Sequence, residues 1–174
     1  MPAKKHIATI TVGAGGAASI EFAGIPQTGT DLVLEVSGRN ATSQHKLWMQ
    51  VNASAAGYTY RSLVGSGSTV YSGANGDGND RFAPQGYTVP AGASNFSSIQ
   101  IFIPNYAGAS AKSVSFNGVS EANSSEAYQD ATAGLWNSSA AVTSVKLFTS
   151  YPWAQYSTAS LYMFTKGSGG ASVA

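Results

Sequence analysis

Apolar and polar residues alternate along most of the chain, as expected for β-strands that bury one face. The clearest run is Ser97–Ile103, in which Ile99, Ile101 and Ile103 share one face. No apolar pattern of helical period extends far enough to predict a helix. Further strands are predicted at His6–Val12, Ser19–Phe22, Asp31–Gly38, Lys46–Val51, Tyr58–Val64, Lys112–Val119, Ala131–Trp136, Val142–Thr149 and Thr158–Thr165.

A weak stretch, Gly65–Ala93, interrupts this series. Its centre, Gly73–Asp80, reads Gly-Ala-Asn-Gly-Asp-Gly-Asn-Asp. We expect a loop there, because glycine and asparagine interrupt regular elements. Short strands are expected on either side of this loop, at Thr69–Tyr71 and Arg81–Phe82.

Short strands separated by turn residues predict an all-β fold: a single-domain, antiparallel β-sandwich of jelly-roll type with about eight to ten strands. A length of 174 residues fits one domain. We expect an N-terminal arm over residues 1–6, the sandwich over residues 7–166 and a flexible, glycine- and serine-rich C-terminal tail over residues 167–174. The predicted core comprises Ile20, Phe22, Leu32, Leu34, Ile99, Ile101, Ile103, Val114, Phe116, Leu135, Leu147 and Leu161.

Composition narrows the range of partners. Charged residues make up 10% of the chain and the net charge is +1, whereas globular proteins average about 25% charged residues. The chain has no basic stripe to neutralise phosphates, so nucleic acid is not expected as a partner. No segment approaches the roughly 20 apolar residues of a membrane span, and Ile7–Val12 alternates too strictly for the apolar core of a signal peptide. A surface with few charges is best tolerated in an assembly.

The titratable residues do not form a recognisable catalytic or metal-binding motif. Glu21 and Glu35 could meet as the acid pair of a glycosidase if their strands paired, although each also suits a solvent-facing strand position. The two histidines, His6 and His45, have no nucleophile elbow and no ligand spacing around them. The chain contains no cysteine, so it forms neither disulfides nor thiolate metal sites. We therefore predict no catalytic residue, no metal site, no cofactor and no enzymatic activity.

The segment Asn75–Asp80 has two interpretations. It places oxygen-bearing side chains at alternate positions, as calcium loops do. Read from Asn75, however, Asp80 and Gly86 stand where such a loop needs glycine and glutamate. A polar loop tip is therefore the preferred interpretation.

The large aromatic residues also have two interpretations. They can stack on sugar rings in a binding groove, or they can pack in the core and in loops, which is the more common role. The candidates for sugar contact are Trp48, Trp136, Trp153 and the loop-like segment Tyr151–Tyr156.

Three segments form a recognisable set: Phe22–Leu34, with its Ile-Pro-Gln-Thr-Gly; Ile103–Gly108, which reads Ile-Pro-Asn-Tyr-Ala-Gly; and Gly134–Val142, which reads Gly-Leu-Trp-Asn-Ser-Ser-Ala-Ala-Val. In this order and spacing they resemble small β-rich virion structural proteins of tailed bacteriophages. The likeness covers most of the chain, from about Ile7 to Phe164. It implies a role in the virion, on the capsid exterior or on a tail appendage, and transfers no catalytic residue.

The resemblance, the size and the low charge together favour a capsid decoration (cement) protein, which stabilises the head by binding on the lattice of the major capsid protein. We expect a homo-oligomer, with a trimer preferred, on the exterior of a capsid assembled in the bacterial host cytoplasm. The alternative is a tail-fibre or tailspike module that binds a host surface glycan, marked by exposed aromatic side chains with converging polar groups. A small hydrolase is disfavoured by the acids and histidines available.

Overall fold

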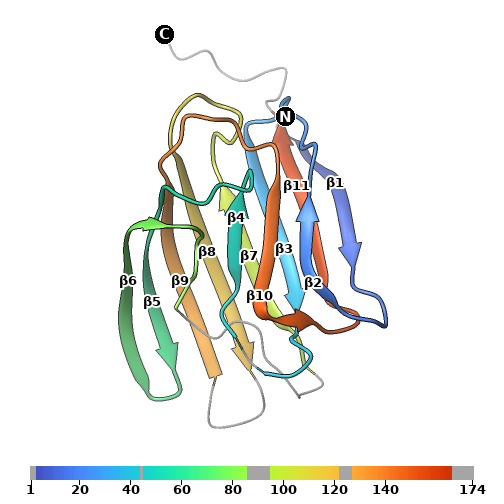
Figure 1. The fold of residues 1–174 in the computed structure, drawn as a ribbon, viewed down its shortest axis with the longest axis vertical. Helices are drawn as coiled ribbons and strands as arrows, with labels where there is room; N and C mark the ends of the chain where they lie inside the picture. Colours follow the sequence, from blue (N-terminus) through green and yellow to red (C-terminus); the bar gives the residue numbers. More distant parts are fainter. Residues whose placement is uncertain (1–2, 44, 86–94, 122–126, 166–174) are drawn as a thin grey trace.

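Two antiparallel β-sheets, packed face to face, make up the fold (Figure 1). The computed structural model describes residues 3–43, 45–85, 95–121 and 127–165. Within these ranges it contains eleven strands, and no helix long and apolar enough to cross a membrane. The strands are β1 (Ala3–Thr11), β2 (Ala17–Phe22), β3 (Asp31–Gly38), β4 (Trp48–Val51), β5 (Tyr58–Ser66), β6 (Thr69–Asn79), β7 (Ser97–Ile103), β8 (Lys112–Glu121), β9 (Ala127–Trp136), β10 (Val145–Trp153) and β11 (Thr158–Thr165).

The connectivity is that of a jelly roll. The large sheet has eight strands in the order β1-β11-β3-β7-β8-β9-β5-β6, and the small sheet has three in the order β2-β10-β4. Along the chain, β1 to β4 alternate between the two sheets, as β10 and β11 do. The hairpin β5–β6 and the pair β8–β9 are additions that widen the large sheet only. The predicted jelly-roll-like sandwich is therefore confirmed.

One strand position of the small sheet is reduced to a single bridge. After β6 the chain returns to the small sheet beside β4, where Phe82 pairs with Met49. The Phe82 N–H donates to Met49 O at 2.9 Å, and the Phe82 O accepts from Met49 N–H at 3.0 Å. The strand predicted at Arg81–Phe82 is present only as this bridge, so the small sheet stays narrow.

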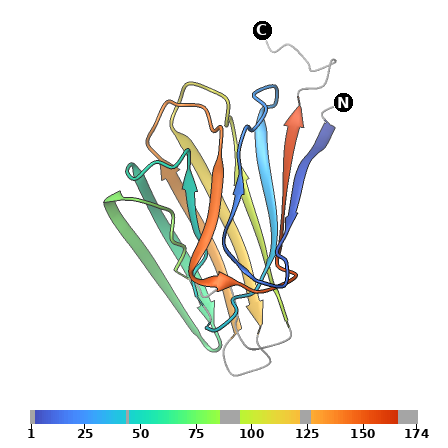
Figure 2. The same ribbon diagram turned by 45° about the vertical axis from the view of Figure 1, so that its right-hand side comes forward.

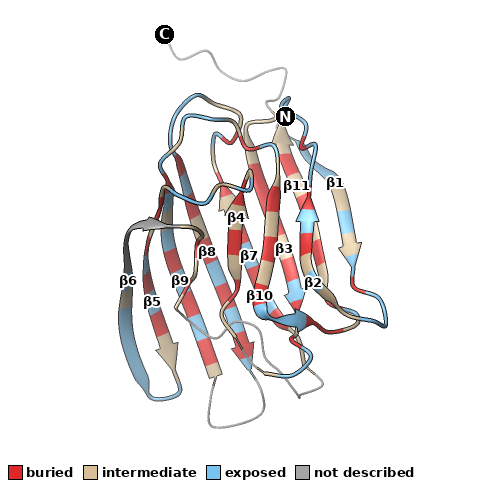
Figure 3. Cartoon of the chain, viewed as in Figure 1, coloured by how far each residue is buried: buried red, intermediate tan, exposed pale blue. Residues whose placement is uncertain are grey.

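Alternation places the core between the sheets, as the buried bands along the strands in Figure 3 show. β7 buries its three isoleucines and exposes Ser98 and Gln100. All predicted core residues are buried except Leu135, which is 37% exposed. Leu135 lies on the outer face of β9 because its neighbour Trp136 points inward, and successive strand residues face opposite sides.

The ends of the chain differ in part from the prediction. β1 begins at Ala3, so residues 3–6, expected in an arm, pair with β11 in the register Ala3 to Thr165 and His6 to Tyr162. The expected tail over residues 167–174 lies outside the described residues.

The segment Gly73–Asp80, predicted as a loop, is mostly strand. β6 extends through it to Asn79 and pairs with β5 alone. Glycine at position 73 has a packing reason, because a Cβ there would lie 2.5 Å from the Gln85 Cγ. Pairing with β5 and this close approach outweigh the low strand propensity of the sequence.

The large sheet extends sideways beyond the small one, with β5 and β6 at its far edge (Figures 1 and 2). Phe82 covers part of this overhang. Its ring packs edge-on against Tyr58, with centroids 4.9 Å apart, and lies 5.4 Å from the ring of Phe116. The short segment around Phe82 thus replaces a full strand as cover for the inner face.

Replacing Ile101 with alanine should lower the free energy of unfolding by about 2–5 kcal/mol, because a cavity would form in the sandwich core. Ile101 is fully buried between the sheets. Chemical denaturation followed by circular dichroism measures the change. The control, Ser98→Ala on the exposed face of the same strand, should change it by less than about 0.5 kcal/mol. Equal losses in the two variants would contradict the assignment of the core.

Candidate functional site

The two carboxylates considered as a catalytic pair lie on opposite outer faces of the sandwich. Glu21 is exposed on β2 of the small sheet, whereas Glu35 lies on β3 of the large sheet. Glu35 Oε1 accepts hydrogen bonds there from Lys4 at 3.5 Å and from Gln100 at 3.1 Å. With the core between them, the two carboxylates cannot flank one scissile bond.

The two histidines pack against different aromatic residues. His6 on β1 packs edge-on against Tyr162, with ring centroids 5.3 Å apart, and His45 packs against Trp48 at 4.8 Å. In the described part of the chain, no three His, Asp or Glu side chains gather where they could hold a metal ion.

Asp80, the last residue of the segment considered as a calcium loop, pairs with its neighbour Arg81. The Arg81 Nε and Nη2 lie 2.6 and 2.5 Å from the carboxylate. These hydrogen bonds hold the pKa of Asp80 below its usual value. The other residues considered as part of a calcium loop, 75–79, have side chains that lie outside the described ones.

The aromatic residues considered for sugar contact do not form one platform. Trp136 and Trp153 are core residues, 3% and 0% exposed. Trp48 lies on the outer face of the small sheet, but the Arg81 guanidinium lies over its ring at 4.5 Å. Tyr151 on β10 is 38% exposed, and its ring packs against His45, which in turn packs against Trp48. One ring face of Trp48 is therefore already occupied by a cation.

The three segments that carry the resemblance meet at one end of the sandwich, around Tyr106. Its hydroxyl donates to Pro26 O and accepts from Gly29 N–H at 3.2 Å, and its backbone O accepts from Val142 N–H at 2.8 Å. Tyr106 is fully buried, and burial raises its pKa. Tyr106, a residue of the β7–β8 loop, therefore bonds to the β2–β3 loop through its hydroxyl and to the β9–β10 loop through its backbone oxygen. Sequence reasoning did not single it out, although it lies in the recognised segment Ile103–Gly108.

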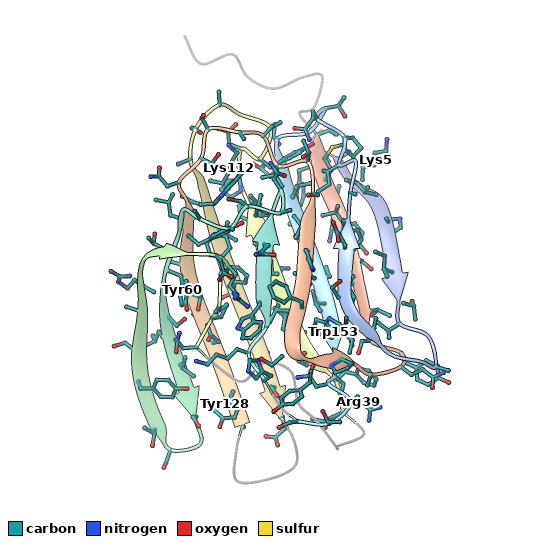
Figure 4. All side chains as sticks on the ribbon, viewed as in Figure 1. Lys5, Arg39, Tyr60, Lys112, Tyr128 and Trp153 are labelled. Carbon is teal, nitrogen blue, oxygen red and sulfur yellow. The ribbon has the colours of Figure 1, made fainter. Side chains whose placement is uncertain are left out.

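A buried lysine, Lys112, holds the β7–β8 loop at the same end (Figure 4). Its Nζ donates to Gly108 O at 2.7 Å and to Ser110 O, and burial lowers its pKa. The sequence contained a signal for this inward position, since Lys112 has the same strand parity as Val114 and Phe116.

The outer face of the large sheet carries an uncharged strip along β8 and β9. Its short side chains leave a hollow of about 470 Å³ that Phe102 and Pro104 also line. Val119 and Leu135, which are 52% and 37% exposed, stand at opposite ends of the strip. The strip itself carries no charge, so a partner bound on it would desolvate charges only at its borders, where Arg61 lies opposite Ala133 and Glu35 lines a hollow with Asn117. This β8–β9 strip consists of Ser113, Ser115, Asn117, Val119, Gln129, Ala131, Ala133 and Leu135.

Comparison with known proteins returned no match to any protein-family model, any curated protein or any solved structure. The resemblance to phage virion proteins stays a prediction. Function is therefore inferred from the surfaces of this chain, among them the β8–β9 strip.

Replacing Tyr106 with phenylalanine should lower the free energy of unfolding by about 1–3 kcal/mol, because two backbone groups lose a hydrogen-bond partner. It should also speed hydrogen exchange at the Gly29 amide, which donates to the Tyr106 hydroxyl. Denaturation and NMR-detected exchange measure the two effects. Tyr156→Phe is the control, since Tyr156 is 67% exposed. If both variants behaved alike, Tyr106 would not be the link between the loops.

Stability should rise with pH on the approach to 10.5, the ordinary pKa of lysine. Burial lowers the pKa of Lys112 in the folded protein, so the unfolded chain binds more protons between the two pKa values. Lys112→Met should make this rise of stability with pH less steep. Part of the rise should remain in the variant, because burial also lowers the pKa of Lys46. Urea titrations below the pH of tyrosine ionisation measure the slope. Lys5→Met on the exposed β1 should keep the wild-type slope; a wild-type slope in Lys112→Met would refute the assignment.

Proposed function

We propose that this chain is a structural protein of a tailed-bacteriophage virion, and that it acts as a capsid decoration (cement) protein bound outside the head on the lattice of the major capsid protein. The observation that carries the proposal is the β8–β9 strip. It is an uncharged, hollowed surface on a wide sheet, and its short side chains allow close approach of a partner. Such a surface serves attachment rather than chemistry.

The loop end around Tyr106 also supports a virion role. The three segments that resemble phage virion proteins are distant in sequence, yet hydrogen bonds join them into one unit. A likeness that follows one structural unit is more informative than the same number of scattered matches. It favours a shared architecture for the loop end of the sandwich.

Oligomer formation fits the same proposal. A decoration protein binds many equivalent sites, and linked copies reach high avidity from modest contacts. We propose a homo-oligomer, with a trimer preferred, in which each copy turns its β8–β9 strip towards the major capsid protein. Its location is the capsid exterior of a particle assembled in the bacterial host cytoplasm.

The alternative is a tail module that binds a host glycan. It is favoured by one cluster on the outer side of the small sheet, where His45 contacts both Trp48 and Tyr151 with ring centroids 4.8 and 5.9 Å apart. The cation over Trp48 reduces the aromatic surface left for a sugar. We therefore rank this function second.

Replacing Ala131 with arginine should weaken binding to capsids at least about tenfold, or 1.4 kcal/mol, because it places a long charged side chain in the strip. Ala131 is exposed and lines the hollow. Co-sedimentation of purified protein with capsids that lack it measures binding. Glu21→Gln is the matched control, since it changes the net charge by the same amount on the opposite side of the sandwich.

Immunogold imaging of intact particles with an antibody to this chain tests the location. We expect label over the head. Label confined to the tail would favour the glycan-binding module, and particles without label would overturn the virion proposal.

A further inference from the structure

The large sheet ends in two edge strands. β1 forms one edge and pairs with β11, and β6 forms the other and pairs with β5; no further described strand covers either edge. Backbone N–H and C=O groups at an open edge can pair with a strand of another chain. Proteins therefore protect such edges with charged side chains or bulges.

β1 carries both kinds of protection. Lys4, Lys5 and His6 are exposed along it, and Lys4 reaches Glu35 at 3.5 Å. The register with β11 shifts between His6 and Ala8, as at a bulge. A second strand would have to displace these charges and follow the irregular backbone.

β6 lacks both protections over Thr69–Ala74. No side chain in that range is charged, and its register with β5 runs without a shift. Val70 is 69% exposed and Tyr71 is 37% exposed. The strand lies at the outer margin of the molecule (Figure 1). A regular, uncharged edge with exposed apolar side chains is available for pairing with a strand of another chain.

The hairpin turn determines which backbone groups of β6 point to the open edge. Ser66 and Thr69 face each other across the two-residue turn Gly67–Ser68, and the pair beside such a turn exchanges both backbone hydrogen bonds. Alternate residues from Thr69 onward therefore bond to β5. The intervening residues direct their N–H and C=O outward; they are Val70, Ser72 and Ala74.

We propose that β6 pairs antiparallel with β6 of a second copy of this chain, with Ser72 opposite Ser72 at the twofold axis. Ser72 is the middle one of the three outward-directed residues, so this register uses all of them in both copies. It places Val70 opposite Ala74 and Tyr71 opposite Gly73. The proposal depends on the sheet edges alone and not on a role in the virion.

The side chains are self-complementary in this register. In this register Tyr71 lies opposite Gly73 on both sides of the axis, next to the Gln85 side chain that already packs over that glycine. Val70 gains an apolar neighbour in Ala74. No charge meets a like charge anywhere in the contact, in contrast to a pairing through Lys4 and Lys5 of β1. A second copy is therefore the partner that this edge fits.

Single cysteines test the register, because the chain has none of its own and a new thiol can form a disulfide only between copies. Ser72→Cys should give a covalent dimer under mild oxidation at least about tenfold faster than a control, since directly opposed residues lie within disulfide range. Ser98→Cys, exposed on the outer face of the same sheet, is that control. Non-reducing electrophoresis over time measures both rates.

Val70→Cys tests the alignment itself. In the proposed register its two copies are offset by four residues, or roughly 13 Å, which exceeds disulfide range. It should cross-link no faster than Ser98→Cys. Equal rates for Val70→Cys and Ser72→Cys would overturn the register.

Sedimentation equilibrium tests whether the contact exists without a cross-link. The wild-type chain should associate with increasing concentration, and Val70→Lys should shift it towards the monomer, while Val70→Thr should not. A wild-type chain that is monomeric throughout, together with slow cross-linking of Ser72→Cys, would overturn the proposal. So would protection of the Ser72 amide from hydrogen exchange only on capsids, which would assign the edge to a capsid strand. Loss of capsid binding in Ala131→Arg bears on the virion proposal and leaves this one unaffected.

Discussion

The inner face of the large sheet has to be covered, and the small sheet is too narrow to cover it. Apolar side chains on β5, β8 and β9 extend past β4, and leaving them in water would forfeit much of the stabilisation that a sandwich obtains from burial. Tyr58 resolves part of this mismatch. Its ring lies against Phe82 and Trp136, and its hydroxyl accepts from Val51 N–H at 2.8 Å and donates to Val51 O at 3.1 Å. One side chain from the large sheet thus occupies the place of a missing strand partner beside β4.

A buried polar network covers the remainder of the overhang. The hydroxyl oxygens of Ser62 and Thr132 lie 2.5 Å apart, and the Thr132 hydroxyl donates to the Asp130 carboxylate at 2.5 Å. The Ser62 hydroxyl also accepts from the Gln85 backbone N–H at 3.1 Å. Lys46 reaches Gln85 at 2.8 Å; burial lowers the Lys46 pKa and the charge of Asp130 opposes that shift. Buried polar groups lose free energy when they lack partners, so this network allows few other positions for the segment that carries Gln85. Side-chain hydrogen bonds thus hold the segment around Gln85 in place, whereas a full strand would be held by backbone pairing with β4.

Sequence periodicity predicted the strands whose two faces differ most. β7 is the clearest case, because its isoleucines alternate with polar residues. Leu135 was misplaced because Gly134 leaves the alternation of β9 undefined, and only the burial of Trp136 decides which side faces inward. β6 was predicted only at its start, Thr69–Tyr71. The rest was missed because its glycines and asparagines suit a loop, and the pairing with β5 that makes it a strand is a tertiary effect. On β8 the strip follows the polar parity of Ser113, Ser115 and Asn117. On β9 the outward parity holds two alanines and Leu135, so only the face that the small sheet covers decides which side is exposed. Tyr106 could be recognised as a link only after the three loops were seen together.

The two surfaces proposed for association lie on the same sheet, and their geometry makes them compatible. Antiparallel pairing at an edge relates two strands by a twofold axis perpendicular to the sheet, so pairing through β6 would continue the sheet and keep both outer faces on one side. Two β8–β9 strips would then face the same direction without either being covered. A partner with repeated sites could bind both strips at once, and linking them would raise avidity without a new contact. A threefold contact elsewhere on the chain is compatible with this arrangement, because neighbouring threefold positions in a capsid lattice are related by twofold axes. An open edge and an uncharged face, each unfavourable on a free monomer, are thus both accounted for if the chain functions as part of a lattice.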